Sequence, residues 1–124
     1  MPLVILMSVT SIHALDRLYT VGPVEVNSIH PIKDGLILVS LNGNSTCTYL
    51  QSWAIKDMKS SMAVLLNAKT TGSKVRIMAR KNENGGGSPY STVWKWGETS
   101  DLTETMLPFS KDMWCHEAFS VMMD

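Results

Sequence analysis

Three aromatic side chains in the carboxyl-terminal half of the chain are the residues best suited to bind a ligand. Tyr90, Trp94 and Trp96 stand at even spacing in a segment whose pattern predicts a strand, so they would share one face of it. Aromatic rings arrayed in this way stack on a sugar ring or a nucleic-acid base, and Arg76 and Arg80 on a nearby strand would supply positive charge. We therefore predict a ligand-binding platform of these five residues. The alternative is that the three aromatic rings fill the core.

Catalytic chemistry has less support in the sequence. The compact trio Cys115, His116 and Glu117 holds a nucleophile, a base and a carboxylate, but neighbours on a strand point to opposite faces, so Cys115 and His116 would not meet. His30 precedes Pro31 in a predicted turn, where it would lie at the surface. No acidic residue stands in an apolar setting that would suit glycoside hydrolysis. We expect a non-enzymatic protein, with a small secreted hydrolase as the alternative from a different class.

The composition is that of an ordinary globular protein. The chain has 124 residues, 44% of them hydrophobic, and its formal net charge is zero. This length favours one domain, and the composition argues against disorder and against a strongly basic nucleic-acid-binding protein. Single-stranded nucleic-acid binding through the same aromatic face is the weaker alternative. Two widely spaced cysteines and three histidines make no structural zinc set, and we predict neither a metal nor a cofactor.

Charge is distributed unevenly along the chain although the total is balanced. Residues 56–81 carry seven lysines and arginines against Asp57 alone, whereas residues 98–124 carry six acidic residues against Lys111 alone. We expect the two segments to lie side by side in the fold and to neutralise each other. The alternative is two separate patches for partners.

The first fourteen residues resemble a secretory signal peptide. They contain no Asp, Glu, Lys or Arg, their apolar run spans residues 3–7, and Ala14 would precede the cleavage point. No basic residue stands at the amino end, and Ile12 is larger than such a site prefers, so a buried first strand is the alternative. Nothing later provides about 18 consecutive apolar residues, and we predict no membrane span. The expected protein is secreted or periplasmic, with one domain over residues 15–124.

Cys47 and Cys115 are the only cysteines in the chain. In the oxidising compartment that a signal peptide implies, the two would pair by default and close most of the domain into one loop. Without the signal peptide, both would be free thiols. We predict the disulfide.

An amphipathic helix over residues 54–69 is the element around which the rest of the chain is arranged. Its predicted apolar face comprises Ala54, Ile55, Met58, Met62, Ala63, Leu65 and Leu66. Gly72 can adopt the left-handed conformation that ends a helix. A strand follows in which Val75, Ile77 and Ala79 would point inward.

Short strands are predicted on both sides of this helix. They cover residues 24–29, ending before Pro31, and residues 36–41, 46–50 and 114–122, with turns at 33–35 and 42–45. Residues 82–88 and 98–112 are predicted as surface connections. Because the order of elements lacks the βαβ rhythm of a parallel sheet, we predict the α+β class, with a small OB-like antiparallel sheet or barrel packed on one central helix.

The segment from Cys47 to Arg80 resembles a known family. Its succession of a cysteine, an amphipathic helix and the run A-K-T-T-G-S-K-V-R-I is similar to the passage from helix to strand in the small OB-like B subunits of bacterial AB-type toxins of the subtilase-cytotoxin and pertussis-like group. None of the sugar-binding motifs of those toxins is recognisable in this chain. The resemblance implies an OB-like fold and a secreted setting. It also suggests a module that binds a glycan or another protein and forms a homo-oligomer.

Overall fold

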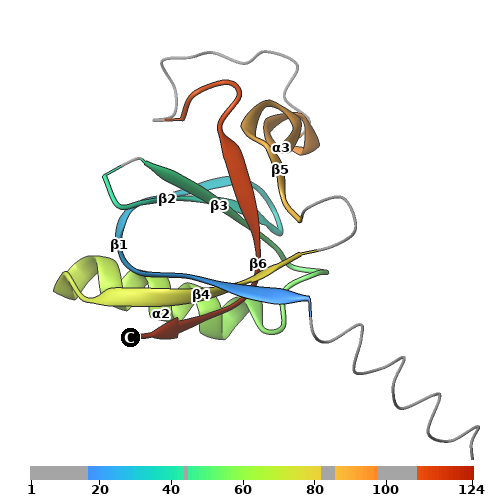
Figure 1. Cartoon of the computed structure of the whole chain (residues 1–124). Helices are drawn as coiled ribbons and strands as arrows, with labels where there is room; N and C mark the ends of the chain where they lie inside the picture. The colour runs from blue at the N-terminus through green and yellow to red at the C-terminus, as the bar shows by residue number, and fades with distance from the viewer. Residues whose placement is uncertain (1–16, 44, 82–85, 98–108) are drawn as a thin grey trace, which may run out of the picture.

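The computed structural model describes residues 17–43, 45–81, 86–97 and 109–124. These residues form one mostly antiparallel sheet of six strands with two helices (Figure 1). The strands are β1 (Leu18–Lys33), β2 (Leu36–Leu41), β3 (Thr46–Gln51), β4 (Lys74–Arg80), β5 (Ser88–Pro89) and β6 (Trp114–Met123). The helices are α2 (Met58–Thr71), between β3 and β4, and α3 (Tyr90–Trp96), between β5 and β6. The predicted signal peptide and most of the two predicted surface connections lie outside the described residues.

Five of the strands form a ring-like circuit. β1 pairs with β2 and with β4, β2 pairs with β3, and β6 completes the circuit by pairing antiparallel with β4 and parallel with β3. β5 adds a short antiparallel segment to β6. Figure 1 shows that β1 bends. Its first half pairs with β4 and its second half pairs with β2.

The bend in β1 has a cause in the sequence. The register between β1 and β4 shifts between Val21 and Val24, on either side of Gly22. Gly22 has a φ of 110°, and a Cβ at this position would lie 2.6 Å from the carbonyl oxygen of Val75. Only glycine fits this close approach of two strands without strain, and the irregularity lets β1 curve from one neighbour to the other.

The predicted end of this strand before Pro31 is wrong. β1 continues to Lys33, so His30 lies within a strand and not in a turn. The pairing of β1 with β4 stops at Glu25, which leaves β1 with β2 as its one paired neighbour around Pro31. A proline is tolerated there because one side of the strand needs no hydrogen-bond donor.

Two apolar cores lie on the two faces of β2. Val39 and Leu41 point to the first core, which the strands of the ring share with Leu65 of α2. Leu36 and Leu38 point to the second core, which α3 covers. Because β2 is buried on both faces, its sequence is an almost continuous apolar run.

Helix α2 begins later than predicted. Asp57 is its N-cap, and the Asp57 side chain accepts a hydrogen bond from the backbone N–H of Ser60 at 3.0 Å. Gly72 ends the helix in the left-handed conformation, with φ 75°, as predicted. The buried face is narrower than predicted, since Ala63 is exposed and Leu66 is 52% exposed. The residues that α2 buries are Ser61, Leu65 and Ala68.

The strand predicted over Tyr90, Trp94 and Trp96 is wrong. These residues form helix α3, which begins directly after Pro89. Tyr90, Val93 and Trp94 are its buried residues, and their spacing of three and four is that of a helix face. The sheet therefore packs on two helices, and the even spacing of the aromatic residues does not place them on one face.

The rest of the predicted elements are confirmed. β2 and β3 form an antiparallel hairpin, Val75, Ile77 and Ala79 of β4 are buried in alternation, and β6 covers the predicted last strand. The expectation that the basic and acidic segments lie side by side is confirmed where β4 pairs with β6. Ion pairs join Arg76 to Asp124 and Arg80 to Glu117 across these strands.

The predicted disulfide is present. Cys47 of β3 and Cys115 of β6 are joined, with their Cα atoms 4.4 Å apart and a sequence separation of 68. Both cysteines are fully buried, and they face each other directly in the register of the parallel pair. The disulfide therefore fastens the one parallel pairing of the described circuit.

Candidate functional site

Two of the predicted platform residues lie in the second core. Tyr90 is 3% exposed and Trp94 is 5% exposed, and the Tyr90 ring packs on Phe109 with the ring centroids 5.1 Å apart. Tyr90 and Trp94 therefore fit the alternative prediction, in which the aromatic rings fill the core. Tyr90, Trp94 and Trp96 do not form an open aromatic platform.

Trp96 has a different position at the end of α3. It is partly exposed, and its ring meets the ring of Tyr49 edge-on, with the centroids 5.4 Å apart. Tyr49 itself is almost fully buried on β3. Trp96 thus packs against the edge of the second core, on the ring of Tyr49.

That hydroxyl group takes part in a chain of polar contacts. Tyr49 donates a hydrogen bond to Oε1 of Glu117 at 3.2 Å. Nε of Arg80 lies 3.2 Å from Oε2 of the same carboxylate, which makes an ion pair, although the Nε–H is not aligned for a hydrogen bond. Nη2 of Arg80 donates to the carbonyl oxygen of Ala54 at 2.7 Å, and the guanidinium lies 4.8 Å from the centre of the Phe119 ring.

A second polar pair borders this chain. The hydroxyl group of Tyr19 on β1 lies 2.5 Å from Nδ1 of His116 on β6, and the two rings meet edge-on. His116 directly precedes Glu117 on β6, so the two pairs are neighbours along that strand. We name this region the Glu117 cluster; its members are Tyr19, Tyr49, Arg80, Trp96, His116 and Glu117.

Regular strand pairing holds the cluster in place. Tyr49 faces Glu117 in the parallel register of β3 and β6, two residues beyond the disulfide between Cys47 and Cys115. Arg80 ends β4 beside β6. Because Tyr49, Arg80 and Glu117 stand on strands that pair through β6, the relative positions of these three side chains are set before any ligand arrives.

Burial dominates the electrostatics of the cluster. It raises the pKa of Tyr49 well above the ordinary value, and the neighbouring carboxylate of Glu117 raises the Tyr49 pKa further. Burial also raises the pKa of Tyr19 and lowers the pKa of His116. Both phenols thus keep their protons near neutral pH, and burial favours the neutral imidazole of His116, which leaves Arg80 and Glu117 as the two charged members.

The cluster combines groups suited to a polyhydroxylated ligand. The Arg80 side chain is 40% exposed and the Glu117 side chain 17% exposed, so a guanidinium and a carboxylate both reach the surface. Trp96, packed on the ring of Tyr49, offers part of an indole ring. Donors, acceptors and an aromatic ring within one rigid region can hydrogen-bond and stack on a sugar.

Arg76 does not belong to this region. It lies four positions before Arg80 on β4, which corresponds to about 13 Å of extended strand. Arg76 pairs with Asp124, its Nε 2.6 Å from Oδ1. Among the five predicted site residues, Trp96 and Arg80 are linked through Tyr49 and Glu117, whereas Tyr90 and Trp94 pack against each other in the second core.

Four members of the cluster were not predicted as ligand-binding residues. Tyr19, Tyr49, His116 and Glu117 come from three strands, and no local motif links them. The sequence trio that includes His116 and Glu117 was considered only for catalysis, and Cys115 of that trio is held in the disulfide. One sequence signal pointed to a contact between Arg80 and Glu117. Arg80 belongs to the basic segment 56–81 and Glu117 to the acidic segment 98–124, which we expected to lie side by side.

Comparisons with protein-family models, with curated proteins and with solved structures find no match for this chain. Within the described residues, no helix has the length and apolar character needed to cross a membrane. The same residues contain no group of three or more His, Cys, Asp or Glu side chains that could hold a metal ion.

Proposed function

We propose that this chain is a secreted or periplasmic, non-enzymatic binding protein whose OB-like barrel binds a glycan at the Glu117 cluster. The observation that carries the proposal is the partly exposed contact between the Arg80 guanidinium, the Glu117 carboxylate and the Tyr49 hydroxyl group, with Trp96 packed on the Tyr49 ring. A sugar presents hydroxyl groups to such a region and an apolar ring face to the indole.

The order of strand pairing supports the OB-like assignment. The circuit runs from β1 through β2 and β3 to β6 and back through β4, with a helix between β3 and β4. OB-folds are five-stranded, partly open barrels that bind oligosaccharides and oligonucleotides beside their central strands. The zero net charge of the chain favours the sugar over the nucleic acid.

The secreted setting rests on two features of the chain. The disulfide belongs to an oxidising compartment, and the apolar leader of residues 1–14 has the composition of a signal peptide. Sequencing of the amino terminus after expression with an intact leader tests this proposal. A mature chain that starts at residue 15 supports it, and a chain that keeps Met1 in the cytoplasm contradicts it.

A glycan array tests the binding function. The mature, oxidised protein should bind a restricted set of immobilised glycans in a saturable manner and release them unchanged. Binding to no glycan, or conversion of the bound glycan to smaller products, would contradict the proposal.

The resemblance to toxin B subunits also suggests self-association. Size-exclusion chromatography with light scattering measures the mass of the assembly. A closed ring of identical chains would support this part of the proposal, and a monomer at high concentration would contradict it.

A further inference from the structure

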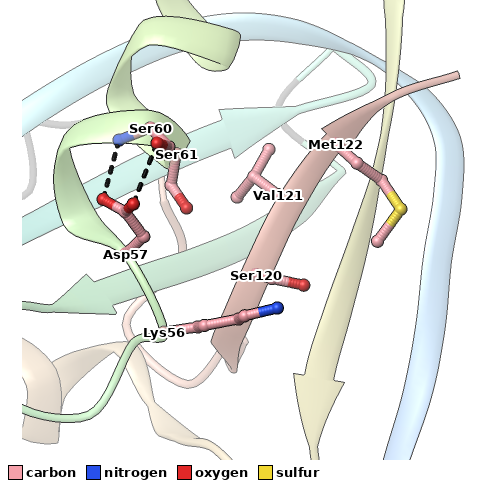
Figure 2. A pocket seen from close by; sticks show the side chains of 7 residues that line it. All are labelled: Lys56, Asp57, Ser60, Ser61, Ser120, Val121 and Met122. Atoms are coloured by element: carbon pink, nitrogen blue, oxygen red, sulfur yellow. Dashed lines mark hydrogen bonds between the residues drawn. The ribbon is translucent and has the colours of Figure 1, made fainter.

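A cavity of about 350 Å³ lies between the start of α2 and strand β6 (Figure 2). It is lined by Lys56, Asp57, Ser60 and Ser61 on one side and by Ser120, Val121 and Met122 on the other. Its volume falls within the range of small-molecule sites, roughly 300–1,000 Å³. It shares no residue with the Glu117 cluster, so it is a separate feature of the molecule.

Backbone contacts fix the two walls of this cavity relative to each other. The N–H of Lys56 donates to the carbonyl oxygen of Phe119 at 2.8 Å, which ties the segment before α2 to β6. Asp57 is already occupied as the helix cap. One of its carboxylate oxygens accepts from the Ser60 N–H and the other from the Ser60 hydroxyl group, each at 3.0 Å. Each carboxylate oxygen of Asp57 thus already accepts one hydrogen bond within the first turn.

The groups left for a ligand are mostly hydrogen-bond donors. Figure 2 shows the Lys56 side chain extending along the cavity toward Ser120. Ser61 is only 3% exposed and lines the cavity, and its hydroxyl group is bonded to none of the other side chains there. Thr70 and Thr71 of the same helix, in contrast, turn their hydroxyl groups back to backbone carbonyls four residues earlier. The Ser61 hydroxyl group is therefore available to a molecule that enters the cavity.

The charge of the site is weakly positive. The Lys56 ammonium offsets the Asp57 carboxylate, and the amino end of a helix adds roughly half a positive charge. A donor-rich, weakly positive cavity matches an oxyanion better than a cation or a neutral apolar molecule. We infer that this cavity binds the oxyanion of a small ligand, a carboxylate or a phosphate group, between Lys56, Ser61 and Ser120.

Amide NMR spectra of the oxidised protein test this inference. Sodium phosphate and sodium acetate are titrated separately, with sodium chloride keeping the ionic strength constant. We expect at least one of the two anions to cause saturable shifts at the amides of Lys56, Ser61 and Ser120, and the better anion identifies the chemical class. Shifts that sodium chloride alone reproduces, or the absence of saturation with both anions, would overturn the inference.

Matched variants separate a specific site from general attraction to positive charge. Lys56→Met removes the ammonium and keeps an apolar stem, and Ser61→Ala removes the buried hydroxyl group. Each should weaken anion binding about tenfold, the effect of one lost charge-assisted hydrogen bond. Lys59→Met is the control, because Lys59 is an exposed lysine of the same helix turn outside the cavity lining. Equal losses in the two lysine variants would refute the site, and this comparison holds even if Ser61→Ala does not fold.

Discussion

Trp94 and Trp96 differ in role although they are two residues apart on one short helix. Trp94 is buried in the second core, whereas Trp96 packs against the edge of that core, on Tyr49, and stays partly exposed. We expect Trp94→Ala to lower the free energy of unfolding by about 3–5 kcal/mol, because it leaves a large cavity. Trp96→Ala should cost less than half of that and should weaken glycan binding. Chemical denaturation of both variants checks the stabilities, and equal losses would show that Trp96 is also a core residue.

His116 gives the protein a stability that depends on pH. Burial lowers the pKa of His116 below its ordinary value of 6.5, since the charged imidazolium would lose its water. The unfolded chain therefore takes up this proton at a higher pH than the folded protein does. The contribution of neutral His116 to stability is complete above about pH 6.5 and is lost as the pH falls below that value.

We therefore expect the melting temperature to drop between about pH 7 and pH 5, and to drop less in His116→Gln. Burial also lowers the pKa of His30, so His30 makes the melting temperature fall over the same pH interval. The substitution His30→Gln measures the share of the pH dependence that His30 contributes. Thermal melts across this interval make the comparison. A pH dependence that neither substitution reduces would contradict the assignment.

Two glycines with positive φ show how single elements depend on local geometry. Gly22 lets β1 approach β4, where an added Cβ would lie 2.6 Å from the carbonyl oxygen of Val75. Gly72 ends α2 with φ 75°, but a Cβ there would meet nothing within 4 Å. Gly72→Ala should cost about 1–2 kcal/mol, the strain of a left-handed alanine. Gly22→Ala should cost clearly more, because strain and a backbone clash add. Urea denaturation ranks the two, and the reverse order would contradict the bend assigned to β1.

The elements that the sequence predicted correctly are those with a local cause. The alternation of Val75, Ile77 and Ala79 and the glycine stop at Gly72 depend only on residues nearby in the chain. Helix α3 was missed because Tyr90, Trp94 and Trp96 fit a strand by even spacing, while Tyr90, Val93 and Trp94 fit a helix equally well. Packing on the second core decides between a strand and a helix for this segment. That core is built by strands that are distant from the segment in sequence, so the local pattern does not reveal it.

The candidate site was predicted in part for a similar reason. The residue types of Arg80 and Trp96 suffice to predict them as ligand-binding residues. The contacts that join them, however, involve Tyr49 and Glu117, which stand 68 residues apart. The parallel pairing of β3 with β6 brings those two residues face to face. The local sequence pattern does not indicate which strands pair over such a distance, so Tyr49 and Glu117 could not be placed in the site from the sequence.

The disulfide acts on the whole molecule, because it fastens the strand pair that joins the two ends of the ring-like circuit. Cys47 and Cys115 are 68 residues apart, and in the chain-entropy model a loop of this size stabilises the fold by about 4 kcal/mol. A Cys47→Ser and Cys115→Ser double variant should melt at a clearly lower temperature. Because the Glu117 cluster begins two residues beyond the bond, glycan binding should also weaken in this variant.

Mass spectrometry without reduction should detect the bond in wild-type protein, and two alkylatable thiols in the folded protein would contradict the structure.

The measurement that tests the glycan site most directly compares two arginines of one strand. Arg80 belongs to the Glu117 cluster, and Arg76 pairs with Asp124 at the other end of β4. Each loses the same charge on substitution, so Arg80→Ala and Arg76→Ala form a matched pair. The affinity of each variant is measured by calorimetry for the glycan that the wild-type protein binds best. We predict that Arg80→Ala weakens binding at least about tenfold, as expected for a lost charged hydrogen bond, while Arg76→Ala binds like wild type. Equal affinities of both variants, or a loss confined to Arg76→Ala, would contradict a glycan site at the Glu117 cluster.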